Sequence, residues 1–143
     1  MDKQQFMTHV EHAYDTKEIG PENVFLFKFL QFEFSYDDEN KTCTITCPVT
    51  EPMLNPAGII HGGILTYLAD TAMGHLNGRT KDVPYVTLEM KTSFLKASNT
   101  GNLTATARYI RDGYKVCFME CEIINEQGEL MSVTNGTFYR FEK

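Results

Sequence analysis

Hydrophobic and polar residues alternate through most of the second half of the chain, a pattern typical of strands with one buried face. The first alternating stretch is Tyr85–Ala97, and three more follow at 103–111, 114–124 and 130–141. Turn residues separate them, with Asp112-Gly113 as a strong hairpin signal. The second half therefore predicts four long antiparallel strands joined in sequence order.

The first half adds two strands and a helix. In Thr42–Val49, apolar residues alternate with threonines, and the polar turn at 37–40 joins this strand to an earlier one at about Phe29–Tyr36. Asp2–Asp15 has the spacing of an amphipathic helix. The pattern predicts an N-terminal helix followed by a hairpin.

Between the two halves, residues 64–76 have the spacing of a helix with one broad apolar face. That face comprises Ile64, Leu65, Leu68, Ala69, Ala72, Met73 and Leu76. Asn77-Gly78 is a typical end for such a helix. Taken in order, the elements indicate an α+β fold in which a six-stranded antiparallel sheet wraps around a long central helix, with an N-terminal helix.

The opposite face of the central helix carries Gly63, Tyr67, Asp70 and Gly74, where lysine and glutamate would be usual for a solvated side. Glycine costs a helix roughly 0.5–1 kcal/mol relative to alanine, so two glycines suggest close approach by other atoms. We hypothesise that this face meets a partner subunit, with Asp70 at the seam. A poor helix start and a fraying end are the alternative explanation of the glycines.

Gly62 and Gly63 stand at the expected start of the central helix, directly after His61. The first backbone N–H groups of a helix lack internal partners and carry partial positive charge, which suits a developing oxyanion. No side chain at either glycine blocks access to those donors. His61 is more plausible as a hydrogen bonder that fixes this loop than as a catalyst, and Asn55 lies in the same loop.

Thr87 is the candidate on the strand that follows the helix. Strict alternation places it opposite Val86 and Leu88, on the side of Glu89 and Lys91. If that side meets the helix of a partner, Thr87 helps to place a ligand near Asp70. A surface threonine without a role is the alternative.

Charge and cysteine spacing exclude several functions. The formal net charge is −6, which argues against a general nucleic-acid binder. No apolar stretch reaches the length of a membrane span and the N-terminus lacks the core of a signal peptide, so we expect a cytoplasmic protein.

The four cysteines form two pairs with a spacing of four, Cys43/Cys47 and Cys117/Cys121. On strands, that spacing separates the thiols by about 13 Å, which favours packing cysteines over a metal site.

The motif N-x-x-G-x-x-H-G-G-x-x-x-x-L-A-D, which runs from Asn55 to Asp70, resembles that of the hotdog-fold acyl-CoA thioesterases, and within them the PaaI-like group. The stretch Thr87–Leu95 is also similar to that group, although Lys96-Ala97 replaces the basic residue and proline that usually follow it. The resemblance covers the chain from about Cys47 onward. It implies a single hotdog thioesterase domain over residues 1–143.

The resemblance also implies roles for individual residues. The Gly62 N–H would hold the oxyanion, Asp70 would be the general base or nucleophile, and Thr87 would position water. Asn55 would orient water or the thioester, and His61 would support the loop. For substrate contact we add Gly63 and Tyr67.

The same family is expected to form homodimers with active sites at the interface, often paired into homotetramers as dimers of dimers. The expected activity is that of an acyl-CoA thioester hydrolase (EC 3.1.2.-), with no metal and no cofactor, since coenzyme A is part of the substrate. We expect no nucleic-acid or membrane partner. A non-hydrolytic acyl-CoA binding or regulatory hotdog module is the alternative, although it would need neither Asp70 nor Asn55.

Several points stay open in the sequence. Whether Asp70 activates water or attacks the carbonyl directly is not determined, and neither are the acyl group and the choice between dimer and tetramer. The candidates for the coenzyme phosphates are Arg79, Lys81, Lys96, Arg108 and Lys115.

Overall fold

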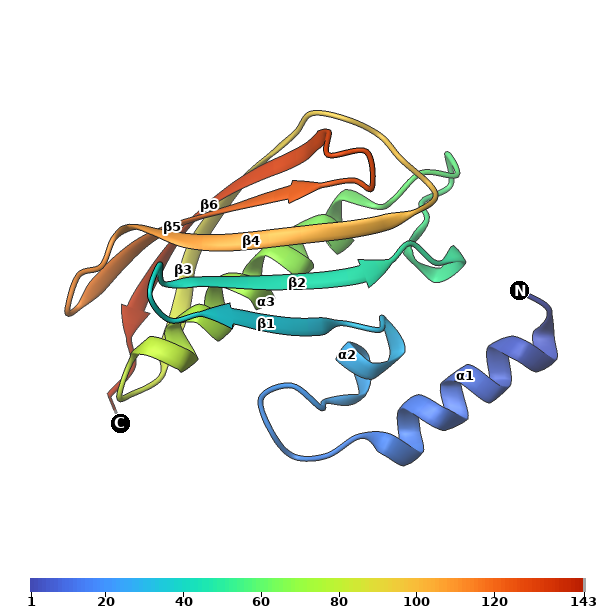
Figure 1. Ribbon diagram of the computed structural model, residues 1–143, viewed down its shortest axis with the longest axis horizontal. Helices are drawn as coiled ribbons and strands as arrows, with labels where there is room; N and C mark the ends of the chain where they lie inside the picture. The colour runs from blue at the N-terminus through green and yellow to red at the C-terminus, as the bar shows by residue number, and fades with distance from the viewer. Residues whose placement is uncertain (143) are drawn as a thin grey trace.

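Six antiparallel strands form one sheet over a long helix, α3, in the computed structural model, which describes residues 1–142 (Figure 1). The order across the sheet is β1-β2-β4-β5-β6-β3. The strands are β1 (Glu33–Asp37), β2 (Thr42–Pro48), β3 (Tyr85–Phe94), β4 (Asn102–Arg111), β5 (Val116–Ile124) and β6 (Leu130–Arg140). The expected fold class is confirmed.

Helix α3 (Gly62–Thr80) buries its apolar side against the inner face of the sheet, as its spacing predicted. The side chains of Leu68, Ala72 and Met73 are fully buried there. Strand β4 presents Ala105 and Ala107 to the same core, and such small side chains allow close approach. Each buried leucine or methionine contributes about 1.5–3 kcal/mol to folding, so this face fixes how α3 is rotated.

The N-terminal segment contains one helix more than the sequence predicted. Helix α1 (Lys3–Thr16) packs against a short helix, α2 (Phe25–Phe29), and lies apart from the sheet in Figure 1. Our prediction of a strand beginning at Phe29 was therefore wrong, and β1 begins at Glu33. A turn with a positive φ at Gln31 separates α2 from β1. The phenylalanines of α2 stand at every second position, which is a strand-like spacing, and on the helix this spacing directs their rings to both α1 and the body of the protein.

Helix α3 also continues past Asn77-Gly78, where we predicted its end. Asn77 is buried, and its side-chain oxygen accepts a hydrogen bond of 2.8 Å from the hydroxyl of Tyr109 on β4. The same hydroxyl contacts that of Thr80 in the last turn. These tertiary contacts hold the last turn in place, so the helix ends only at Thr80.

A β-bulge in β3 changes the face on which Thr87 lies. Thr87 pairs with Phe138 of β6, whereas Glu89 pairs with the next residue, Thr137, so Leu88 is an extra residue. Phe138 is buried on the inner face, and Thr87 therefore points toward α3. The expectation that Glu89 and Lys91 share the side of Thr87 was wrong, because strict alternation breaks at the bulge.

The four cysteines lie in pairs on β2 and β5, and all are buried and free. Their interpretation as packing residues is confirmed by this burial. Within residues 1–142, no group of three or more His, Cys, Asp or Glu side chains is arranged to hold a metal ion.

Candidate active site

The loop before α3 is shaped by the side chain of Asn55. Its Oδ1 accepts hydrogen bonds from the N–H groups of Ala57, at 2.9 Å, and Ile59, at 3.4 Å. The backbone closes the same turn, because Gly58 N–H donates to the carbonyl oxygen of Asn55 at 2.8 Å with a positive φ. The oxygen of Asn55 is thus committed to the loop, and only its NH2 group is left to donate to a ligand.

His61 caps α3 through its side chain. Its Nδ1 accepts a hydrogen bond of 2.9 Å from the N–H of Gly63, and its carbonyl oxygen accepts from Ile64. A ring nitrogen that accepts carries no proton, so the neutral ring has its proton on Nε2. This geometry fits a residue that fixes the loop.

Gly62 is the first residue of α3, and its N–H has no acceptor within the described part of the chain. A cavity of about 380 Å³ opens there, lined among others by Asn55, Gly62, Phe94 and Lys96. A Cβ atom at Gly62 would lie 2.9 Å from the ring of Phe94, so this position is adapted to glycine. The free donor and the helix dipole together suit an anionic oxygen.

Asp70 lies half-buried in the middle of α3 and is held by Thr87. The Thr87 hydroxyl donates a hydrogen bond of 2.7 Å to Asp70 Oδ1, which the β3 bulge makes possible. Oδ2 is left for water or for a substrate. Burial, and next the negative charge of Asp70, raise the pKa of Tyr67, whose ring packs against Phe27.

The expected catalytic residues fall into two groups within one chain. Asn55, His61 and Gly62 gather at the start of α3, and Asp70 and Thr87 meet near its middle. Asp70 lies eight positions after Gly62, which is about 12 Å along a helix. A single carbonyl cannot lie within about 3 Å of both the oxyanion donor and the carboxylate of one chain.

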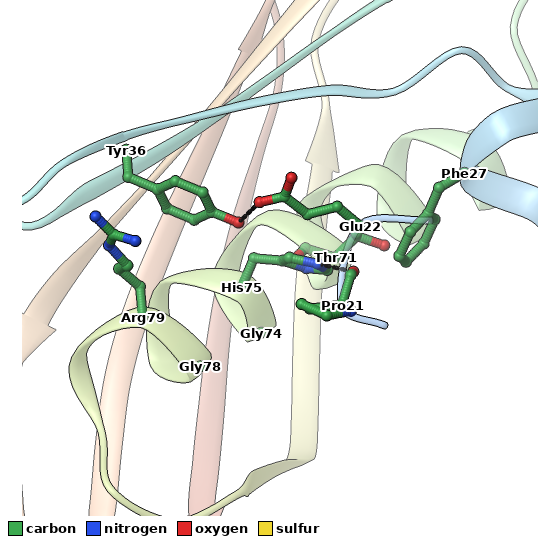
Figure 2. Close-up of a pocket in the computed structure, with 9 residues that line it drawn as sticks. All are labelled: Pro21, Glu22, Phe27, Tyr36, Thr71, Gly74, His75, Gly78 and Arg79. Carbon is green, nitrogen blue, oxygen red and sulfur yellow. Dashed lines mark hydrogen bonds between the residues drawn. The ribbon is translucent and has the colours of Figure 1, made fainter. Parts of the chain in front are cut away.

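A second cavity, of about 430 Å³, opens along α3 from Thr71, the residue after Asp70, to Arg79 (Figure 2). Thr71, Gly74 and His75 form its α3 side, and Glu22 and Tyr36 face them from the N-terminal segment and β1. The sequence analysis missed Glu22, Tyr36 and His75 as site residues. Of these three, only His75 had a feature in the sequence that could have indicated it, because it lies one turn after Thr71 on α3.

Most of the candidates for the coenzyme phosphates already have carboxylate partners. Arg79 pairs with Asp38, Lys81 with Asp112, Lys96 with Glu129, and Arg108 with Glu120 and Glu122. Of these, Lys96 lines the cavity at Gly62.

The family model of the Thioesterase superfamily matches residues 57–132, more than half of the chain, and this range contains Gly62, Asp70 and Thr87. The chain belongs to the Thioesterase superfamily. The 1,4-dihydroxy-2-naphthoyl-CoA hydrolase of Listeria monocytogenes is 29% identical over 101 residues, which are 69% of this chain and 82% of that protein.

Solved structures agree with this assignment. The PaaI protein of the Escherichia coli phenylacetic acid degradation operon superposes with a TM-score of 0.76 at 26% identity, covering 97% of this chain and 95% of that one. The BH2602 protein of Bacillus halodurans, solved with CoA, gives a TM-score of 0.87 at 22% identity, covering 100% and 97%. The resemblance to PaaI-like hotdog thioesterases is confirmed. Membership of this superfamily supports a hydrolase of the thioesterase type.

None of the helices within residues 1–142 is long and apolar enough to cross a membrane.

Proposed function

We propose that this protein hydrolyses acyl-CoA thioesters to free acid and CoA, in sites shared between the two subunits of a homodimer. The observation that carries the proposal is the Asp70 carboxylate, which Thr87 holds with one oxygen bonded and one left free. The related CoA hydrolase of Listeria monocytogenes and the CoA bound to the Bacillus halodurans protein support the coenzyme part of the substrate.

The chemistry needs two functions acting at one carbonyl. The unpaired N–H of Gly62 polarises the thioester C=O and stabilises the tetrahedral oxyanion. The free oxygen of Asp70 either takes a proton from attacking water or itself attacks the carbonyl carbon. The NH2 group of Asn55 donates to the thioester or to water, and His61 keeps the loop in shape.

Two subunits are needed because the two groups of residues lie too far apart in one chain. Strand β3 is one of the two edges of the sheet and is ten residues long, and its large apolar side chains Val86, Leu88 and Phe94 are exposed. Such an edge readily pairs with another strand. Pairing β3 with β3 of a second copy joins the two sheets and brings Gly62 of one copy to Asp70 of the other. Assembly into a tetramer stays a prediction.

The first experiment measures CoA release from a panel of acyl-CoA esters by wild type and Asp70→Asn. Asparagine keeps the size of the side chain and the hydrogen bond from Thr87 but removes the negative charge. We expect turnover by wild type to fall at least about 100-fold in the variant, as for loss of a general base. Unchanged turnover in a folded dimeric Asp70→Asn would refute the proposal.

The non-hydrolytic binding module is tested in the same samples. Tight binding of CoA esters by wild type without release of CoA would favour that alternative. Single-turnover hydrolysis in 18O-labelled water then separates the two roles of Asp70, because label enters the carboxylate only after direct attack.

A further inference from the structure

The cavity beside Asp70 is lined by aromatic rings, by one carboxylate, that of Glu22, and by one guanidinium, that of Arg79. The ring of Phe27 packs edge-on against that of His75, with centroids 5.5 Å apart, and both line the cavity. Glu22 faces them from the N-terminal segment (Figure 2). Within residues 1–142, Glu22 forms no ion pair, and Arg79, which lines the same cavity, is held by Asp38 through two hydrogen bonds of 2.9 and 2.8 Å from its Nε and Nη2 atoms.

Glu22 is fixed in this position by two contacts. The Tyr36 hydroxyl donates a hydrogen bond of 2.7 Å to Glu22 Oε1. The two ring nitrogens of His75 lie against carbonyl oxygens, Nε2 against that of the preceding residue, Pro21, and Nδ1 against that of Thr71, and a neutral ring donates to only one of them. His75 thus lies between the N-terminal segment and α3, and its ring lines the cavity. Oε2 of Glu22 is left as a hydrogen-bond acceptor.

The cavity begins where an acyl group bound at Asp70 would enter it. Thr71 follows Asp70 directly, and Gly74 lies one turn further on, about 6 Å along the helix. A Cβ atom at Gly74 would meet nothing within 4 Å, so the cavity is open at this position, which lies four residues after Asp70 on the same side of the helix. A six-carbon acyl chain spans about one helix turn and places its far end near Glu22.

We infer that this cavity holds the acyl group and that Glu22 is a specificity-determining residue, which selects acyl groups ending in a hydroxyl and rejects those ending in a carboxylate. The inference rests on the proposed function of Asp70. A carboxylate accepts hydrogen bonds only, so Oε2 binds a hydroxyl donor and repels a second negative charge. Burial and the hydrogen bond to Glu22 raise the pKa of Tyr36, which keeps its hydroxyl a donor to Oε1.

The test uses three CoA esters of equal length, hexanoyl-CoA, 6-hydroxyhexanoyl-CoA and adipoyl-CoA. Wild type is expected to give the highest kcat/KM with the hydroxylated ester, and a value for adipoyl-CoA about tenfold or more below that for hexanoyl-CoA. Glu22→Gln should reduce the discrimination against adipoyl-CoA at least about tenfold. Glu18→Gln is the matched control, because it removes the same charge from an exposed position in the same segment.

A second variant tests the location. Gly74→Val fills the open space of the cavity at this position, so kcat/KM should fall far more for hexanoyl-CoA than for acetyl-CoA. Equal losses for both esters would overturn the location. Equal rates for adipoyl-CoA and 6-hydroxyhexanoyl-CoA in wild type, or an unchanged ratio in Glu22→Gln, would overturn the role of Glu22.

Binding measurements separate this inference from the proposed function. Calorimetric titration of the same three esters into Asp70→Asn reports selectivity without turnover. If binding is selective, Glu22→Gln abolishes the selectivity and wild type releases no CoA, the inference about Glu22 is supported and the proposed hydrolase activity is refuted. If wild type releases CoA but neither binding nor turnover is selective, the hydrolase activity is supported and the inference about Glu22 is refuted.

Discussion

The oxyanion donor that we propose, the backbone N–H of Gly62, can be removed with little other change. Proline has no backbone N–H, and it is well tolerated at the first position of a helix, which is where Gly62 lies. The preceding residue, His61, has φ −64° and ψ 131°, a conformation that a following proline favours. Gly62→Pro should therefore fold with α3 intact and lose the donor.

Gly62→Ala is the matched control. Both substitutions place a Cβ atom 2.9 Å from the ring of Phe94, which must shift. Phe94 is 55% exposed, so its ring has room to move, and we expect the alanine variant to lose less than about tenfold in kcat. Loss of one oxyanion donor costs about 2.7–4 kcal/mol, or about 100- to 1,000-fold in kcat.

The expected result is thus a difference of about 100-fold or more between the proline and alanine variants. CoA release is followed continuously with a thiol reagent, and circular dichroism checks the helix content of each variant. Equal rates for the two variants, with equal helix content, would show that the Gly62 N–H does not bind the oxyanion.

Three further predictions follow from the same geometry. The inactive variants Asp70→Asn and Gly62→Pro, unfolded and refolded together in equal amounts, should recover about a quarter of wild-type activity. Half of the dimers are then mixed, and each mixed dimer has one intact site out of two. If mixed dimers form without recovery of activity, both groups act within one chain. Thr87→Val should lower kcat about tenfold by leaving Asp70 Oδ1 without its donor, and Thr87→Ser should restore most of it; kinetics with equal losses for both variants would contradict the positioning role. Burial raises the pKa of the Cys43, Cys47 and Cys121 thiols to about 12, so native protein should react with thiol reagents only as fast as it unfolds, and rapid reaction at pH 8 would refute their burial.

The elements with regular burial were predictable from sequence. The central helix and the strands β4, β5 and β6 each keep one buried face over two or more turns or several residue pairs, and the pattern reports that face directly. The positions of Gly62 and Asp70 on the helix followed from the same spacing. In α2 the phenylalanines have the period of a strand although the segment is a helix, and there the sequence analysis did not find the helix.

The missed features depend on contacts between distant segments. Tyr36 meets Glu22 across 14 residues, and His75 meets Pro21 across 54 residues, so no local pattern connects them. The prolonged end of α3 depends in the same way on Tyr109, 32 residues from Asn77. Asp70 and Thr87 were each recognised, but their contact depends on a bulge that alternation cannot reveal.

That bulge absorbs a change of length without moving the site. An exposed strand at the edge of a sheet usually tolerates the gain or loss of a residue, because little packs against it. In β3, Leu88 is the extra residue between Thr87, which pairs with Phe138, and Glu89, which pairs with Thr137. Deletion of Leu88 alone would restore strict pairing and leave Thr87 opposite Phe138 on the inner face, while Met90 and the residues after it kept their places. Relatives with and without this extra residue should therefore both be able to keep a hydroxyl that faces Asp70.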